Sequence, residues 1–170
     1  MRLVFWVALA TFLTDQASKW LVVHWMNLRQ LGEIELLPPF LNFRMAWNYG
    51  INFGLFSGGS DGARWVLIGL AVAIVVAVLV WTWRQPPGRW GMVAAGLLIG
   101  GALANVLDRL VYGAVADFLN MSCCGIENPF AFNVADVAIF AGAIGLALFT
   151  GDGKGTGGGG TGAKPGKKPA

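Results

Sequence analysis

The chain has 170 residues, of which 56% are hydrophobic and 12% are charged, and its mean hydropathy is +0.62. An ordinary soluble domain carries about a quarter charged residues, so this chain has too few charges to cover a water-facing surface of its size. The net charge of +3 gives no reason to expect nucleic-acid binding. The composition therefore excludes an ordinary soluble globular protein and predicts an all-α membrane protein.

Four apolar runs each approach the length of roughly 20 residues that a membrane-spanning helix needs. They cover residues 3–25, 65–83, 91–112 and 130–150. The second run carries no charge, whereas polar residues interrupt the other three. A buried soluble core is the alternative, but it does not account for four such runs in one short chain. We therefore predict four transmembrane helices in one domain over residues 1–150.

The first run has a second interpretation. Arg2 precedes it, as a basic residue precedes the apolar region of a cleaved signal peptide. However, the run continues past Lys19 to Trp25, and no small-x-small cleavage site stands out. A membrane span is the preferred interpretation, and a signal peptide remains the alternative.

The basic residues divide unequally between the two sides of a four-span topology. One side carries Arg2, Arg84, Arg89, Lys154, Lys164, Lys167 and Lys168, and the other carries Arg29, Arg44 and Arg64. The positive-inside rule then places both termini in the cytoplasm and segments 26–64 and 113–129 outside. Residues 151–170 are rich in glycine and lysine and cannot bury apolar surface, so we expect a disordered cytoplasmic tail.

The first outer segment is unusually apolar. Residues 34–56 are apolar and aromatic, with interspersed prolines and glycines, and the side chains of residues 40–47 fall into two alternating sets. This pattern predicts a small extended or β-like segment beside the helices. Such a segment at the bilayer surface suits a site for a lipid-bearing ligand. A loop packed on the helix ends explains the pattern equally well, and both interpretations stay open.

Polar side chains gather near one end of the third and fourth runs. An ionisable group in the hydrocarbon zone costs roughly 2.5 kcal/mol or more, so it usually has a partner and a purpose. Asn105, Asp108 and Arg109 are three and four residues apart and share one helical face. Asn133 and Asp136 are likewise three residues apart. These positions are candidates for a functional site.

Two carboxylates are predicted to meet at the outer surface. Gly113 is expected to end the third span, which leaves Asp117 in the loop beyond it, at a depth similar to that of Asp136. Carboxylates that share a site hold one proton between them, so one can take a proton from water while the other polarises a carbonyl. This chemistry needs no metal and no cofactor, and we expect neither. The structural alternative is an ion pair of Arg109 with Asp108 or Asp117, and we expect Arg109 and Asp108 to pair in this way.

Other catalytic combinations are weaker. Cys123 and Cys124 are adjacent, which strains a disulfide and does not match the spacing of zinc ligands, and His24 is the only histidine. Ser18 precedes Lys19, but neighbours on a helix point about 100° apart and do not face each other as a Ser–Lys pair would.

Four blocks occur in order along the chain: DQASK at 15–19, NYGINFG at 48–54, GGALANVLDRLVYGAVADF at 100–118 and FNVAD at 132–136. Together, on four predicted spans, they resemble the signature blocks of the lipoprotein signal peptidase (signal peptidase II) family. The resemblance covers nearly the whole chain to about Thr150. Ile51 and Asn52 stand where the family commonly has alanine, and Ala104 where it has glycine. Only the departure at Ala104, in the third run, is conservative in size. The departures bear on the shape of the outer loop and leave the carboxylates unaffected.

The resemblance implies an intramembrane aspartic endopeptidase of the bacterial cytoplasmic (inner) membrane. It would remove signal peptides from diacylglyceryl-modified prolipoproteins by cutting before the lipidated cysteine. By motif match, Asp117 and Asp136 would form the catalytic dyad, and Asn133 would help to orient Asp136. The matched residues that would support the site or contact the substrate are Asp15, Asn48, Asn105, Asp108 and Arg109, with Asp108 supporting Arg109. The implied partners are the lipid-modified substrate and membrane lipid, and a monomer is expected.

Two other classes of function remain as alternatives. A small carboxylate-based proton or cation transporter would distribute polar groups through the depth of the membrane. Here they gather near the outer end, with Asp15 as a partial exception. A non-enzymatic scaffold would need no pair of aspartates at matched depth.

Overall fold

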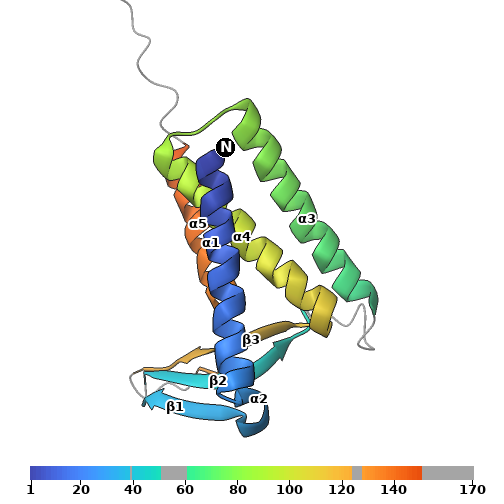
Figure 1. The fold of residues 1–170 in the computed structure, drawn as a ribbon, viewed down its shortest axis with the longest axis vertical. Coiled ribbons are helices and arrows are strands. Elements are labelled where there is room, and N and C mark those ends of the chain that lie inside the picture. The colour runs from blue at the N-terminus through green and yellow to red at the C-terminus, as the bar shows by residue number, and fades with distance from the viewer. Residues whose placement is uncertain (39, 51–60, 124–127, 151–170) are drawn as a thin grey trace, which may run out of the picture.

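The computed structural model describes residues 1–38, 40–50, 61–123 and 128–150. In this part of the chain, four long helices run along the molecule and a small sheet lies across one end of them (Figure 1). The N-terminus lies at the opposite end, beside the α3–α4 connection. The predictions for Ile51, Asn52, Gly54, Cys124 and the tail concern residues outside the described ranges.

The long helices coincide with the four apolar runs. They are α1 (Arg2–Lys19), α3 (Asp61–Arg84), α4 (Arg89–Tyr112) and α5 (Val134–Phe149). Helix α1 continues directly into a π-helical stretch, η1 (Trp20–Trp25), and the single turn α2 (Leu28–Leu31) follows. Helix α5 begins later than the apolar run because Phe132 is extended and pairs with Leu119, and Asn133 is the N-cap.

Helix α4 is the centre of the bundle and contacts α1, α3 and α5. Its small residues allow these close approaches, as is common where helices pack within membranes. A Cβ atom at Gly100 would collide with the carbonyl oxygen of Ala8 on α1. A Cβ atom at Gly101 would lie 2.6 Å from the carbonyl oxygen of Ala135, in the first turn of α5. These two glycines of α4 therefore allow the backbones of α1 and α5 to pack directly against it at Ala8 and Ala135.

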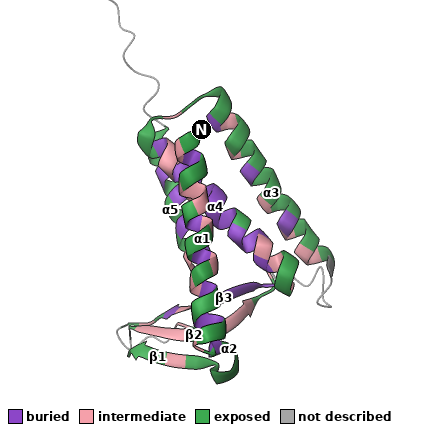
Figure 2. Ribbon diagram, viewed as in Figure 1, coloured by how far each residue is buried: buried purple, intermediate pink, exposed green. Residues whose placement is uncertain are grey.

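The outer surfaces of the helices are strongly apolar. Helix α3 is exposed along most of its length (Figure 2), and its exposed apolar side chains include Leu70, Ile74 and Val76. Among the described residues, Gly62–Arg84 and Arg89–Tyr112 are long and apolar enough to cross a membrane. Helix α5 is apolar but has only 16 residues. Four helices stand where four spans were predicted, and two of them meet the length and composition of a span.

The sheet has three antiparallel strands in the order β1–β2–β3. They are β1 (Glu33–Leu37), β2 (Leu41–Asn48) and β3 (Val115–Met121). The alternating residues 40–47 thus belong largely to a strand, as predicted. The prediction that Asp117 lies in a loop is wrong, because β3 pairs with β2 and places Asp117 opposite Ala46. The partner strand is distant in sequence, so no local pattern around Asp117 revealed the pairing.

A small apolar core joins the sheet to the helix ends. Val22, Leu28 and Phe118 are buried together, and the rings of Phe43 and Phe118 meet edge to face at 5.7 Å. The inner side chains of β2 thus pack on the helix ends, which was one of the two interpretations of this segment. The sheet is thereby packed against η1, α2 and the first residue of α5.

Candidate active site

Asp117 and Asp136 reach the site from two different elements. Gly113 ends α4 in the left-handed conformation, with φ of 80°, and turns the chain into β3, which carries Asp117. Asp136 is in the first turn of α5, where it forms a capping box with Asn133. In this box Asp136 N donates to Asn133 Oδ1 at 2.9 Å, and Asn133 N donates to Asp136 Oδ2 at 3.2 Å.

Asn133 contacts both carboxylates. Its Nδ2 donates to Asp117 Oδ1 at 2.6 Å, while its main chain and Oδ1 hold Asp136. Asn105 Nδ2 donates to Asp136 Oδ1 at 2.9 Å, and Asn48 Nδ2 donates to Asp117 Oδ2 at 3.1 Å. The two aspartates therefore share one amide side chain, and each has a further amide donor of its own.

The surroundings of Asp117 favour its protonated form. The residue is 3% exposed. Burial above all, and then the charge of Asp136, raise the pKa of Asp117 from its ordinary value near 3.8 to about 7, against the opposing effects of Asn48, Asn133 and Lys19. A carboxyl group with this pKa is present in both protonation states near neutral pH, as an acid–base catalyst requires.

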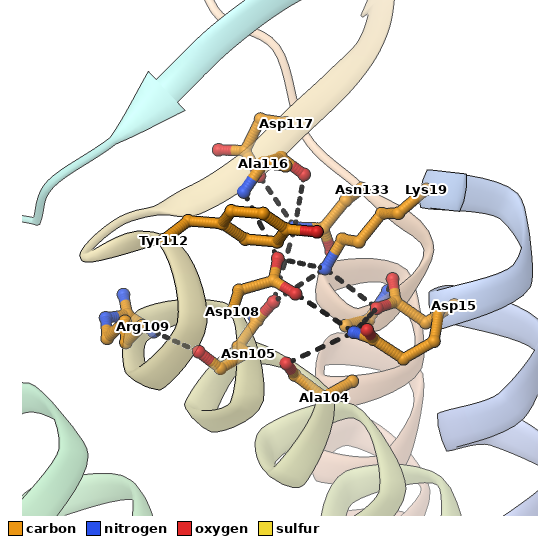
Figure 3. A network of polar contacts seen from close by, with 12 residues as sticks. Asp15, Lys19, Ala104, Asn105, Asp108, Arg109, Tyr112, Ala116, Asp117 and Asn133 are labelled. Carbon is orange, nitrogen blue, oxygen red and sulfur yellow. Dashed lines mark hydrogen bonds and ion pairs between the residues drawn. The ribbon is translucent and has the colours of Figure 1, made fainter. Parts of the chain in front are cut away.

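A buried ion-pair cluster of Asp15, Lys19 and Asp108 lies near Asp117 (Figure 3). Lys19 Nζ is 2.7 Å from Asp15 Oδ2 and 2.7 Å from Asp108 Oδ2. The expected pairing of Asp108 with Arg109 is therefore wrong, because Asp108 pairs with Lys19 on α1 instead. Arg109 Nη1 donates to the carbonyl oxygen of Asn105 at 3.2 Å.

Arg109 and Asn105 line a groove between α3, α4 and α5. The groove has a volume of about 390 Å³, and the rest of its lining is apolar, including Leu70, Ile74 and Ile139. A second groove, between α1, α3 and α4, is larger, with a volume of about 520 Å³. Its lining is apolar and includes none of the candidate site residues. The first groove therefore offers an apolar ligand a surface that ends at Arg109 and at Asn105, whose amide donates to Asp136.

The structure gathers every predicted site residue into one polar network. Its members are Asp15, Asn48, Asn105, Asp108, Arg109, Asn133, Asp117 and Asp136. Sequence reasoning missed the role of Lys19, although its spacing of four residues from Asp15 favours an ion pair on one helix. It also missed Gln16, whose Nε2 donates to Asp108 Oδ1 at 3.0 Å, and nothing local in the sequence signals that contact.

Ser18 and Lys19 do not form a catalytic pair. The Ser18 hydroxyl donates to the carbonyl oxygen of Asp15 at 2.7 Å, and Lys19 is occupied by its two carboxylates. Within the described ranges, no group of three or more His, Cys, Asp and Glu side chains is arranged to hold a metal ion.

A family model described as signal peptidase (SPase) II matches residues 7–150. The chain belongs to the signal peptidase II family. A lipoprotein signal peptidase of Methylorubrum extorquens is 41% identical over 140 residues, which are 82% of this chain and 80% of that protein. A lipoprotein signal peptidase of Rhizorhabdus wittichii is 41% identical over 145 residues, 85% of this chain and 83% of that protein.

Solved structures agree with this assignment. Two structures, each described as a bacterial membrane enzyme, superpose with TM-scores of 0.71 and 0.74 at 27% and 26% identity. The first covers 85% of both chains, and the second covers 88% of this chain and 93% of the other. This family member is thus a bacterial membrane peptidase, and the transporter alternative has no support.

Proposed function

We propose that this chain is an aspartic endopeptidase that removes signal peptides from diacylglyceryl-modified prolipoproteins, cutting on the amino side of the lipidated cysteine. Asp117 and Asp136 are the proposed catalytic dyad. The observation that carries this proposal is the contact of Asn133 with both carboxylates, which holds them at one site. The family and the names of the relatives support the class of substrate.

The proposed reaction uses one proton shared by the dyad. The ionised carboxylate takes a proton from water as the water oxygen attacks the scissile carbonyl carbon. The protonated carboxyl group gives its proton to the carbonyl oxygen, and a tetrahedral diol forms. Collapse of the diol breaks the C–N bond, and the leaving nitrogen takes the proton held by the first carboxylate. The second carboxylate regains its proton from the diol, which restores the dyad.

The neighbouring side chains are proposed to orient the dyad and the substrate. Asn133 and Asn105 fix Asp136, and Asn48 holds the second oxygen of Asp117. Arg109 lines the groove between α3, α4 and α5, where its remaining N–H groups can donate to carbonyl oxygens of the substrate backbone. The apolar walls of this groove suit the apolar part of a lipid-bearing substrate.

The proposed topology has four membrane spans, both termini in the cytoplasm and the active site near the outer face. The N-terminus and the α3–α4 connection lie at one end of the bundle, and the sheet lies at the other (Figure 1). Arg2, Arg84 and Arg89 belong to the first of these ends, which agrees with the positive-inside rule. The exposed apolar side chains of all four helices support burial in lipid.

The test is processing of a diacylglyceryl-modified prolipoprotein by purified protein in detergent micelles. Wild type is expected to cut before the lipidated cysteine, whereas Asp117→Asn and Asp136→Asn fold but do not cut. Thr82→Val is the control, because Thr82 is a buried polar residue at the far end of α3 that bonds only to its own helix among the described residues. Cleavage by either aspartate variant at nearly the wild-type rate would refute the dyad.

A further inference from the structure

The cluster of Asp15, Lys19 and Asp108 has no part in the proposed reaction, although it is among the most buried polar groups of the molecule. The side chains of Asp15 and Asp108 are fully buried, and that of Lys19 is 7% exposed. A buried ion pair is a weak device for stability, since apolar residues of similar volume often do as well or better. The contacts of the two carboxylates suggest a different purpose.

Asp15 holds the residue directly before Asp136. Its Oδ1 accepts a hydrogen bond from Ala135 N at 2.8 Å, while its Oδ2 faces Lys19. Ala135 N is one of the N–H groups that the first turn of α5 leaves without a partner in the helix. Asp15 therefore extends the N-terminal cap of α5 across to α1 and fixes the turn that carries Asp136.

Asp108 holds the residue directly before Asp117. Its Oδ2 accepts a hydrogen bond from Ala116 N at 3.2 Å and also faces Lys19. Its Oδ1 accepts from Gln16 Nε2 at 3.0 Å, so both oxygens are occupied. Asp108 therefore fixes the start of β3 relative to α4, just as Asp15 fixes the start of α5 relative to α1.

Lys19 joins Asp15, which holds the start of α5, to Asp108, which holds the start of β3. It lies 2.7 Å from each carboxylate, and its Nζ also donates to Asn105 Oδ1 at 3.4 Å. That contact leaves the amide nitrogen of Asn105 free to donate to Asp136. Through its two carboxylate partners, a single ammonium group thus reaches the main chain beside both proposed catalytic aspartates, and it also contacts the amide of Asn105, which holds Asp136. Figure 3 shows Lys19 between Asp15 and Asp108.

We infer that Lys19, Asp15 and Asp108 form a clamp that sets the separation and orientation of the dyad, with Lys19 as its joint. The three are positioning residues, because each acts on the dyad through a neighbouring group. The inference rests on the proposed function of Asp117 and Asp136.

The clamp has an electrostatic consequence as well. The charged groups that interact with Asp117 are Asp136 on α5, Lys19 on α1 and Arg109 on α4. Asp15 on α1 and Asp108 on α4 are the ion-pair partners of Lys19. The positive charge of Lys19 lowers the pKa of Asp117, against the larger effects of burial and Asp136. Removing this charge should therefore raise the pKa of Asp117 and move the pH profile of kcat to higher pH. A change that only loosened the packing of the helices would not shift the profile.

The experiment compares Lys19→Met, Lys19→Arg and the control Thr82→Val with wild type in the micellar cleavage assay. kcat and KM are measured per folded enzyme over a range of pH, and the unfolding temperature is recorded. Lys19→Met is expected to lower kcat by about 100-fold with KM within about twofold, because misplacement of reacting groups by about 1 Å costs about this much. Its pH profile should move to higher pH. Lys19→Arg should recover part of kcat and restore the profile, and Thr82→Val should match wild type.

If folded Lys19→Met keeps the wild-type kcat and pH profile while its unfolding temperature falls, the cluster is a structural lock and the clamp is refuted. If Lys19→Met yields no folded protein, Asp15→Asn and Asp108→Asn decide, since both keep the shape of the side chain. Each of these two variants should lower kcat by about tenfold while KM stays unchanged. If both variants keep the wild-type kcat, the clamp is refuted. Failure of wild type to cut, or activity in Asp117→Asn, would instead refute the proposed function.

Discussion

The amide nitrogen of Asn133 lies 2.6 Å from a carboxylate oxygen of Asp117, although Asn133 is the N-cap of the helix that carries Asp136. One side chain thus both starts α5 and ties it to β3. Because an N-cap position is fixed by the helix itself, Asp117 is held relative to Asp136 by ordinary helix-capping geometry.

Two substitutions of Asn133 separate capping from catalysis. Serine caps helices about as well as asparagine but is too short to reach Asp117, so Asn133→Ser should fold with near-native stability and lose at least about 100-fold in kcat. Asn133→Ala removes the cap as well and should cost about 1 kcal/mol of stability in addition. Unfolding temperature and cleavage rate in micelles are the measurements. Wild-type kcat in Asn133→Ser would show that the contact with Asp117 is unimportant.

The rate of cleavage should depend on pH near neutrality. The proposed mechanism requires one proton on the dyad, and the pKa of Asp117 is raised to about 7 by burial and by Asp136. kcat should therefore fall as the pH rises through about 7. Profiles measured with wild type and with Asn48→Ala check this. The hydrogen bond from Asn48 lowers the pKa of Asp117, so its loss in Asn48→Ala should raise this pKa and move the falling limb of the profile to higher pH. A profile that is flat from about pH 6 to about pH 9 would contradict the assignment.

The titration of Asp117 should also make the stability of the protein depend on pH, with stability falling as the pH rises. Since the pKa of Asp117 is higher in the folded state than its ordinary value near 3.8, the folded protein binds this proton more tightly than the unfolded chain does. Its contribution to stability is complete below about pH 4 and is lost as the pH rises to about 7. The difference in unfolding temperature between wild type and Asp117→Asn should change in favour of the variant over this range. A difference that is independent of pH would place the perturbed group elsewhere.

Arg109 should affect substrate binding more than folding. Its guanidinium group lines the groove between α3, α4 and α5 and bonds to Asn105 O within its own helix. Arg109→Lys keeps the charge but loses the planar fork, so KM should rise by about tenfold or more with little change in unfolding temperature. Arg109→Gln should have the larger effect. Steady-state kinetics of the two variants distinguish this role from a structural one, in which stability would fall and KM would stay constant.

The contact between α4 and the first turn of α5 should be sensitive to a single methyl group. A Cβ atom at Gly101 would lie 2.6 Å from Ala135 O, whereas one at Gly69 on α3 meets nothing within 4 Å. Gly101→Ala should therefore displace the turn that carries Asp136 and lower kcat by about 10- to 100-fold. Gly69→Ala is the matched control and should leave activity unchanged. Equal activity in the two variants would mean that the turn tolerates displacement.

Much of this arrangement was accessible from the sequence. The four apolar runs give the four long helices, Gly113 gives the end of α4, and the alternating residues 40–47 give most of β2. These features depend on local periodicity, on the special conformations of glycine and on residue spacing within one element. The spacing of Asn133 and Asp136, three residues apart, likewise corresponds to a capping box.

Apart from the ion pair of Asp15 and Lys19 within α1, the contacts that were missed join distant elements. Strand β3 is defined by pairing with β2, so Asp117 was placed in a loop. Asp108 was assigned to its neighbour Arg109, whereas α1 brings Lys19 to it across the bundle. Packing of one helix against another decides such partners, and the residues of either helix alone do not contain that information. The π-helical stretch η1 similarly has no signature in local composition.

The hydrogen bond between Asp15 and Ala135 joins the first long helix of the chain to the last. Because synthesis proceeds from the N-terminus, α1 leaves the ribosome well before α5. Until α5 has been made, Asp15 lacks its hydrogen bond from Ala135, and Asp136 is absent from the site. If Asp136 belongs to the dyad as proposed, the growing chain cannot cleave its neighbours before α5 is in place.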